Sequence, residues 1–379
     1  HYELVSDVDA SATSGWNDEK GFAPIGSADE PFVGTFDGRN RTISNLYINR
    51  NLRYVGLFSY VDEGGDISNL IVADVNITAE SRVGGVAGTN GGTLRNISVD
   101  GTVRSTSEGF SNSGGLVGEN PGTVRRATAD VTTSGTNTVG GLVGISGGTI
   151  EYSSANGKAS GTETIGGLVG INGGTIKYSS AHGNVSGSQS AGSQSVGGLV
   201  GVNGGGGKTG TIEQSSASGD VTGDLFVGGL AGQNFNSVLN TSSANGTVTG
   251  DRYVGGLAGV AVGGQITDAS ASATVAGTTS VGGLVGANGA QGQPGSTITN
   301  ASASGTVSVP DDAEPTEYVG GLVGQLSQAT VTTSDATVDV DAANSVSVGG
   351  LVGYNNDGEV TQSYATGNVT GNESVGGLV

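Results

Sequence analysis

The sequence predicts an all-β protein, a parallel β-solenoid (β-helix) of about twelve rungs with a period of about 26–31 residues. Three observations predict this fold. A six-residue glycine unit returns along the chain, an aliphatic and small-residue pattern lies between its copies, and the 379 residues include 74 Gly and no Cys. Short strands of this kind cannot bury a face alone, but stacked copies build a continuous core.

The repeated unit has a clear copy in Val139-Gly140-Gly141-Leu142-Val143-Gly144. Its copies begin at Val83, Ser113, Val139, Ile165, Val196, Val227, Val254, Val281, Val319, Val348 and Val375. Successive copies are 26 to 38 residues apart, and the longer steps contain insertions at 187–195, 204–210, 289–295 and 309–317. Loops on a rigid scaffold vary without disturbing it, so we expect these insertions to be recognition surfaces.

A second pattern lies between the glycine units and starts at an aliphatic residue such as Ile150. A small residue follows three positions later (Ser153), Ala five positions later (Ala155) and, in most copies, Val nine positions later. Side chains five, seven and nine positions on share one face of a strand, whereas the step from zero to three breaks the alternation. We therefore expect a bend at the small residue, followed by a strand that faces the core.

Strand alternation places Val139 and Val143 on one face of the glycine unit and Leu142 on the other. Both faces then carry an aliphatic residue, which is typical of a strand buried on both sides. Two alternatives stay open for the leucine face: the same chain covers it, or it forms a stripe that receives a partner. Asn follows many of the units, as at Asn90 and Asn120, where it suits a left-handed turn or a ladder of stacked side chains.

These repeats resemble the GLUG-motif family, named for the Gly-Leu-hydrophobic-Gly sequence found here at residues 141–144. Residues 2–5, 21–26 and 32–38 are similar to the segment that often leads into such arrays. We expect residues 1–50 to form the lead-in and residues 51–379 to form one continuous array. The resemblance implies a secreted or cell-surface repeat region, often in large adhesin-like proteins or beside a separate enzymatic domain, without a catalytic site in the repeats.

The formal net charge is −20, from 34 acidic and 14 basic residues. This balance argues against nucleic acid and anionic membrane surfaces as partners, because both require clustered Lys and Arg. No stretch approaches the roughly 18 apolar residues of a membrane span, so we expect no direct membrane insertion in this segment. An acidic, lysine-poor surface suits a halophilic protein, because high salt screens self-repulsion; the alternative is a surface adapted only for solubility.

The sequence offers little for catalysis, and we expect no enzyme activity, no cofactor and no metal site. Of the two histidines, His1 is a chain end and His182 occupies a variable turn position. Asp311, Asp312 and Glu314 are weak candidates for binding a hard cation, with a solvated acidic loop as the favoured alternative. Residues 204–209 superficially resemble a phosphate loop but lack its first Gly, and we expect no helix after them.

Asn-x-Ser/Thr sequons occur nine times and mark candidate N-glycosylation sites if the protein is secreted. They lie at Asn40, Asn76, Asn96, Asn184, Asn240, Asn245, Asn300, Asn368 and Asn372. The chain begins at His1 and stops inside a repeat at Val379, so we expect segments beyond both ends.

The sequence thus predicts a non-catalytic extracellular or cell-surface structural protein, either the stiff shaft of an adhesin or the subunit of an extracellular filament. The expected partners are further copies of the chain or other surface proteins and glycans. A β-helical carbohydrate-active enzyme or a polysaccharide-binding module is the alternative function.

Overall fold

The computed structural model describes residues 1–188, 194–290, 292–310 and 317–379. Contacts divide the chain into two compact units, His1–Gly183 (unit 1) and Asn184–Val379 (unit 2). Each unit is a parallel β-solenoid, and together they contain about 11 turns, close to the twelve or so expected. The all-β prediction is confirmed. The division at residue 50, with residues 51–379 as one array, stays a prediction.

Unit 1 opens with two short strands and a 3-10 helix, η1 (Ser11–Gly15), and then consists of stacked strands. Its strands are β1 (Tyr2–Glu3), β2 (Val8–Asp9), β3 (Thr35–Ser44), β4 (Tyr47–Val55), β5 (Phe58–Val61), β6 (Asp66–Val83), β7 (Ala87–Asn90), β8 (Thr93–Ser105), β9 (Asn112–Gly114), β10 (Val117–Asn120), β11 (Thr123–Ser134), β12 (Thr138–Gly140), β13 (Val143–Ser146), β14 (Thr149–Glu151), β15 (Ser154–Ala155), β16 (Ala159–Gly161), β17 (Thr164–Gly166), β18 (Val169–Asn172), β19 (Thr175–Lys177) and β20 (Ser180–Ala181). No helix among the described residues has the length and apolar character of a membrane span.

Unit 2 repeats the same succession of short strands. These are β21 (Val185–Gly187), β22 (Ser195–Gly197), β23 (Val200–Gly204), β24 (Thr211–Glu213), β25 (Ser216–Ala217), β26 (Val221–Thr222), β27 (Phe226–Gly228), β28 (Ala231–Asn240), β29 (Ser243–Thr249), β30 (Arg252–Gly255), β31 (Ala258–Thr267), β32 (Ser270–Ala276), β33 (Thr279–Gly282), β34 (Val285–Asn288), β35 (Thr297–Thr299), β36 (Ser302–Ser308), β37 (Val319–Gly320), β38 (Val323–Ser327), β39 (Thr330–Thr332), β40 (Asp335–Ala342), β41 (Val348–Gly349), β42 (Val352–Asn356), β43 (Glu359–Thr361), β44 (Tyr364–Ala365), β45 (Val369–Gly371) and β46 (Val375–Gly376).

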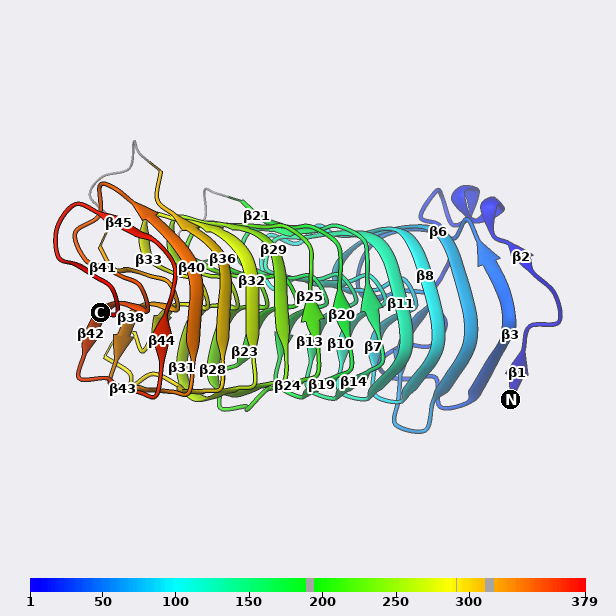
Figure 1. Cartoon of the computed structure of the whole chain (residues 1–379). Helices are drawn as coiled ribbons and strands as arrows, with labels where there is room; N and C mark the ends of the chain where they lie inside the picture. The colour runs from blue at the N-terminus through cyan, green and yellow to red at the C-terminus, as the bar shows by residue number, and fades with distance from the viewer. Residues whose placement is uncertain (189–193, 291, 311–316) are drawn as a thin grey trace. The chain divides into compact units, whose positions relative to one another are not determined.

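Equivalent positions of successive repeats pair in register, as the sequence predicts. In unit 1, β14 pairs with β19 through Ile150 and Ile176. Strands β3, β6, β8 and β11 lie side by side in chain order (Figure 1). In unit 2 the alanine five positions after the aliphatic residue forms a paired column of Ala244, Ala271, Ala303, Ala336 and Ala365. The glycine-flanked repeats are therefore rungs stacked within each unit.

A sharp bend follows the aliphatic residue in each rung, one position before the small residue or, in the first two cases below, before Leu70 and Ile97. The residue there has a positive φ of 47° to 55° at Asn69, Asn96, Arg126, Tyr152, Tyr178, Gln214, Thr241, Asp268, Asn300, Thr333 and Gln362. L-residues adopt this left-handed conformation at a cost of about 1–2 kcal/mol each. The predicted bend is confirmed, and the strain is placed on an outer corner.

Serine occupies the next position because its hydroxyl joins adjacent rungs. The Ser153 hydroxyl donates a hydrogen bond of 2.8 Å to the Glu151 carbonyl oxygen. The Ser153 N–H in turn donates to the Ser179 hydroxyl at 3.2 Å. The same arrangement links Ser215 with Ser242 in unit 2. A hydroxyl at the bend thus satisfies backbone groups that the strand ladder leaves without partners.

The glycine unit differs from its predicted form, because it is two short strands and not one. β12 ends at Gly140 and β13 begins at Val143, with the bend at Gly141 and Leu142. A Cβ on Gly140 would overlap the Val143 carbonyl oxygen, so only glycine permits this close approach. The prediction of alternating faces across the unit was therefore wrong: the bend turns both valines and the leucine into the interior.

The leucine of each complete unit is fully buried within its own chain. This holds for Leu116, Leu142, Leu168, Leu199, Leu230, Leu257, Leu284, Leu322 and Leu351, each 0% exposed. Of the two alternatives for this face, cover by the same chain is confirmed, and a leucine stripe that receives a partner is excluded.

Close packing explains why alanine recurs at its position in every rung from Ala129 onward. A Cβ on Gly141 would lie 3.1 Å from the Ala155 Cβ, and one on Gly229 would lie 3.0 Å from the Ala244 Cβ. The second glycine of the unit therefore faces alanine across the interior. From Ala129 onward the two small residues constrain each other, whereas Val99 occupies the alanine position opposite Gly85.

Candidate functional site

The asparagines after the glycine units form a buried polar ladder. Asn90 donates from Nδ2 to the Asn120 Oδ1 at 2.8 Å, and Asn120 donates to the Ser146 hydroxyl at 3.3 Å. In unit 2, Asn203 donates to Asn234 at 2.8 Å. All these side chains are 0% exposed. The ladder interpretation is confirmed, whereas the left-handed turn was the wrong reason for Asn, because none of these residues has a positive φ.

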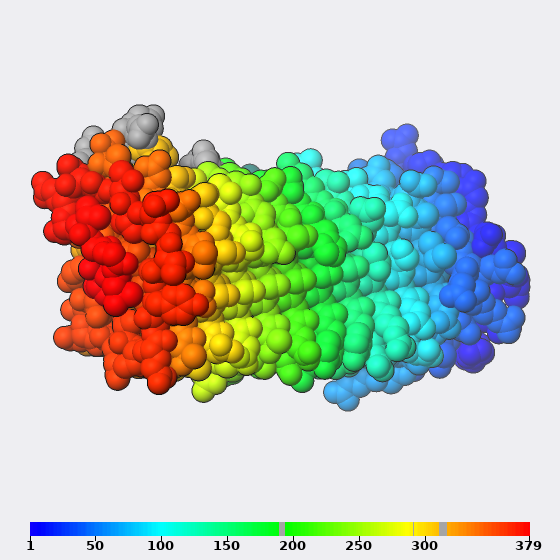
Figure 2. Space-filling view, viewed as in Figure 1, coloured from blue at the N-terminus to red at the C-terminus, as the bar shows by residue number. Residues whose placement is uncertain are grey.

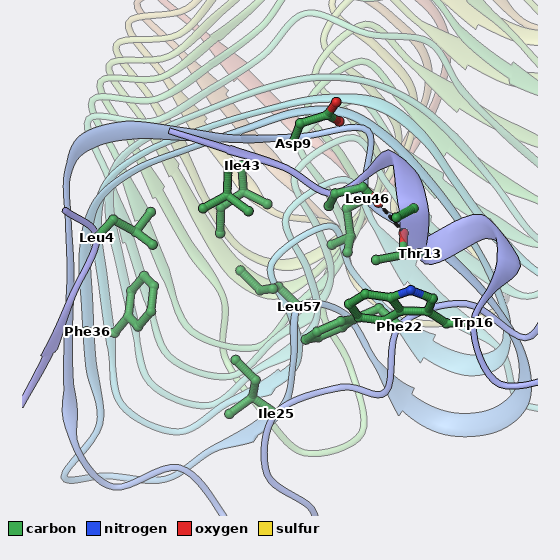
Figure 3. Close-up of a pocket in the computed structure, with 13 residues that line it drawn as sticks. Leu4, Asp9, Thr13, Trp16, Phe22, Ile25, Phe36, Ile43, Leu46 and Leu57 are labelled. Atoms are coloured by element: carbon green, nitrogen blue, oxygen red, sulfur yellow. Dashed lines mark hydrogen bonds between the residues drawn. The ribbon is translucent and has the colours of Figure 1, made fainter. Parts of the chain in front are cut away.

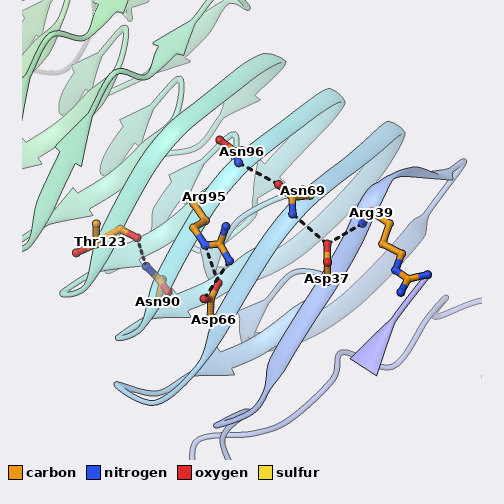
Figure 4. A network of polar contacts seen from close by, with 8 residues as sticks. All are labelled: Asp37, Arg39, Asp66, Asn69, Asn90, Arg95, Asn96 and Thr123. Atoms are coloured by element: carbon orange, nitrogen blue, oxygen red, sulfur yellow. Dashed lines mark hydrogen bonds and ion pairs between the residues drawn. The ribbon is translucent and has the colours of Figure 1, made fainter. Parts of the chain in front are cut away.

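A second polar ladder lies on the exposed corners of unit 1 (Figure 4). Asn96 donates to Asn69 at 2.9 Å, and Asn69 donates to the Asp37 carboxylate at 3.0 Å. The backbone N–H of Arg39 also donates to Asp37 at 2.9 Å. These hydrogen bonds, first that from Arg39 and then that from Asn69, lower the pKa of Asp37, because they favour the ionised carboxylate.

Ion pairs link neighbouring rungs of unit 1. Arg82 pairs with Glu119, and Arg95 lies 3.3 Å from Asp66. The Arg82 guanidinium also lies 5.0 Å from the centre of the Tyr54 ring. Partial burial alone would lower the pKa of Arg82, but the hydrogen bond and the negative charge of Glu119 outweigh this effect, so the pKa is raised. These contacts connect neighbouring rungs.

The residues considered for catalysis and metal binding do not converge. His182 is exposed, and its Nε2 lies 3.0 Å from the Ser180 hydroxyl two residues away. No group of three or more metal-ligating His, Asp or Glu side chains occurs within the described ranges. The cation candidates Asp311, Asp312 and Glu314 lie outside the described residues.

The glycine-rich insertion at 204–210 is a hairpin and not a phosphate loop. Gly205 and Lys208 form an antiparallel bridge, and the chain then enters strand β24. In the insertion at 289–295, Ala290 and Gln293 also form an antiparallel bridge, and residue 291 lies outside the described residues. Residues 189–193 and 311–316 of the other two insertions lie outside the described part of the chain.

The sequon asparagines lie on the outside of the rungs. Eight of the nine are exposed, at Asn40, Asn76, Asn96, Asn184, Asn245, Asn300, Asn368 and Asn372, and Asn240 is half-buried. Some of their side-chain amides have partners already, since Asn96 Nδ2 donates to Asn69, and Asn300 donates to Asp268. Figure 2 shows that side chains of successive rungs form rows along this outer surface within each unit.

A cavity of about 260 Å³ lies under the opening segment of unit 1 (Figure 3). Apolar side chains dominate its lining, including Leu4, Trp16, Phe22 and Phe36. Its polar member Thr13 is satisfied locally, because its hydroxyl donates to the Ala10 carbonyl oxygen at 2.6 Å and accepts from the Tyr47 N–H at 3.1 Å. The Asp9 carboxylate also lines the cavity, and it accepts hydrogen bonds from the Ser11 N–H and the Asn45 amide, both at 3.0 Å. The cavity is a packing space between the lead-in and the first rungs.

The insertion that carries Ala290 and Gln293 borders a second, more mixed cavity in unit 2 that sequence reasoning missed. It measures about 230 Å³ and is lined by Phe226, Gln233, Phe235, Val260, Val262 and Gln293 among others. We call it the amide–aromatic cleft. A signal was present in the repeats: Phe226 stands in register with Ser195, and Phe235 with Gly204. A large aromatic residue where the paired rung has a small residue indicates that the surface differs locally from that of the neighbouring rung.

Comparison with known proteins identifies GLUG repeats in the chain. The family model described as "The GLUG motif" matches residues 192–222, 250–276, 277–308 and 344–370, which confirms the resemblance in these four repeats. Halomucin of Haloquadratum walsbyi is 48% identical over 108 residues, covering 27% of this chain and 1% of halomucin. A putative Gly-rich membrane protein of Evansella cellulosilytica is 36% identical over 109 residues, covering 26% of this chain and 12% of that protein. No solved structure matches the chain.

Proposed function

We propose that this chain is a non-catalytic structural segment of an extracellular surface protein, acting as a stiff spacer in an adhesin or as a subunit of a filament. The observation that carries the proposal is the in-register stacking of rungs around an interior filled with aliphatic side chains. Such quasi-one-dimensional folds extend by adding repeats, because each rung contacts only its neighbours.

The relatives support a location at the cell surface. One is named halomucin and the other a putative Gly-rich membrane protein. This chain spans about 1% and 12% of their lengths, so it corresponds to a small part of much larger proteins. A repeated spacer suits that size relation, since a long projecting protein needs stiff segments more than it needs catalytic ones.

Labelling of intact cells tests the location. A membrane-impermeant amine reagent or external protease should reach the protein in living cells, and the rows of exposed polar side chains should remain accessible. Reaction only after the cells are lysed would refute an extracellular role.

Electron microscopy of the purified native protein separates the two structural roles. Isolated stiff particles would identify a spacer, and long polymers would identify a filament subunit that associates with further copies of itself. Incubation with neutral and acidic polysaccharides tests the enzymatic alternative; new reducing or unsaturated ends would overturn the structural proposal.

We also propose that the exposed sequons carry glycans and that the acidic surface is an adaptation to salt. Eight exposed asparagines offer attachment sites around the rungs. Peptide mass spectrometry of native material tests the first point, and unmodified peptides at all nine sequons would remove it. If the folded protein is most stable in low salt, the acidic surface is not an adaptation to salt.

A further inference from the structure

The amide–aromatic cleft lies on unit 2 where three columns of side chains meet. In the central column, Gln233 pairs in register with Val202 on one side and Val260 on the other. Phe235 pairs with Val262 in the adjacent column. Phe226 flanks the cleft and stacks on Tyr253, with ring centroids 5.4 Å apart and an interplanar angle of 20°. The cleft thus has an apolar floor and aromatic sides.

Gln233 is the unexpected residue in this surrounding. Its side chain is 9% exposed and lines the cleft, between paired valines. The side-chain amide makes no hydrogen bond to any described residue. The amide is not among the fully buried polar groups of the described residues, so its atoms reach the open side of the cleft, where they can bond to a molecule bound there. Such a group points to a ligand or ordered solvent that completes its hydrogen bonds.

The chemistry of the lining selects the kind of ligand. Phe226 and Phe235 supply half-buried rings, Val260 and Val262 supply a floor, and Gln233 and Gln293 supply amides that both donate and accept. No charged side chain of the described residues lines the cleft, although unit 2 is strongly acidic. An ionic ligand would therefore find no counter-charge there, and a neutral ligand is favoured.

The volume of the cleft limits the size of the ligand. A cavity of about 150 Å³ holds benzene, so the 230 Å³ of this cleft accommodates one substituted six-membered ring. A pyranose ring combines an apolar C–H face, which packs on aromatic side chains, with a rim of hydroxyl groups, which hydrogen-bond to amides. We propose that the amide–aromatic cleft binds one residue of a neutral glycan.

Two substitutions test the proposal with little risk to the fold. Gln233→Val gives the residue found at the paired position Val202, and Phe226→Ser gives the residue found at the paired position Ser195. Thr164→Ala changes a half-buried strand residue of unit 1, far along the sequence from the cleft, and is the matched control. Circular dichroism melts of the full chain should show all three variants folded.

Isothermal titration calorimetry of the full chain is the direct assay, with cellohexaose, chitohexaose and mannohexaose as neutral probes and a galacturonic acid oligomer as the anionic probe. We expect at least one neutral probe to bind. Gln233→Val and Phe226→Ser should each weaken binding at least tenfold, and Thr164→Ala should leave it unchanged.

Several results would overturn this assignment. These are no binding of any neutral probe at millimolar concentration, preferential binding of the anionic probe, or full binding by both cleft variants. A fourth is self-association in sedimentation experiments that Phe226→Ser abolishes while the sugars fail to bind. That result would assign the cleft to a second copy of the chain.

Discussion

The two units share an interior but differ on the outside. Unit 1 has twelve basic and nineteen acidic residues, a net charge of −7, whereas unit 2 has two basic and fifteen acidic residues, a net charge of −13. Arginine–carboxylate pairs join rungs in unit 1. The exterior of unit 2 carries the antiparallel bridges of its insertions and the amide–aromatic cleft.

This difference shows that the surface of a rung varies independently of its interior. The glycine unit, its buried leucine and the facing alanine occur in both units with the same packing distances. Interior positions are fixed by the close approach of backbones, while outward positions accept arginine, tyrosine or acidic residues. The comparison can be tested first at the interior, where the effects are largest.

Substitution at the bend should produce the largest effect, and an equal one in both units. Gly140→Val and Gly228→Val each place a side chain against the carbonyl oxygen of Val143 or Ala231. We expect each to destabilise the protein by more than about 4 kcal/mol or to prevent folding. Urea unfolding followed by circular dichroism measures this change.

Gly109→Ala is the control for the bend substitutions, because the added Cβ would lie 3.8 Å from its nearest neighbour, the Ser107 hydroxyl. It should change stability by no more than about 0.5 kcal/mol. Native-like unfolding of Gly140→Val would contradict the requirement for glycine.

Truncation of the buried leucine should give the next largest effect. Leu142→Ala in unit 1 and Leu257→Ala in unit 2 each remove a fully buried side chain, at a cost of about 2–5 kcal/mol. Hydrogen exchange of the intact chain, read by mass spectrometry, should show faster exchange in the unit that carries the change. Leu52→Ala, at a side chain 50% exposed, serves as control. Clearly unequal losses of stability from the two leucine substitutions would show that the interiors of the two units are not equivalent.

The two units should differ in how salt changes their stability. Raising potassium chloride from 0.1 to 2 M screens the repulsion among the acids of unit 2 but also weakens the ion pairs of unit 1. We expect amide exchange in residues 184–379 to slow by roughly threefold more than in residues 1–183. The same experiment with an uncharged osmolyte is the control, and equal responses of the two units to salt would contradict the comparison.

Acid should give the smallest effect on stability, and Asp37 in the exposed ladder of unit 1 allows it to be tested at one carboxylate. The pKa of Asp37 is lowered in the folded protein, so its ionised form stabilises the fold above its unfolded pKa of about 3.9. This contribution is lost as the pH falls through the lower folded pKa. Asp37→Asn should therefore reduce the loss of stability between pH 5 and pH 2, measured as the melting temperature. An unchanged acid dependence would show that the carboxylate contributes nothing.

Much of the fold was predictable because the rungs repeat. The register of Ile150 with Ile176, the alanine column and the bend before Ser153 follow from spacing alone. The form of the glycine unit did not, because alternation assumes one straight strand. The bend at Gly141 and Leu142 arises from backbone approach between rungs, and single-strand periodicity contains no information on that approach.

The candidate site was less predictable than the fold. The insertions at 204–210 and 289–295 were expected as recognition surfaces, but the cleft beside the second insertion combines residues from different rungs. Phe226, Gln233 and Val260 come together through stacking, and each looks unremarkable within its own repeat. A search for residues that depart from the column average, rather than for known motifs, would have found Phe226 and Gln233 before the structure.

The left-handed residue at each outer corner has a consequence for how such chains diversify. Asn, Arg, Tyr, Gln, Thr and Asp all occupy this position with nearly the same backbone angle, so its conformation is imposed by the rung and not by the side chain. Duplication of a rung therefore adds another outward-facing position of fixed backbone conformation. A single codon change can alter the side chain there while the rung keeps its shape. Successive single substitutions can therefore change the row of side chains along this outer corner without altering the backbone.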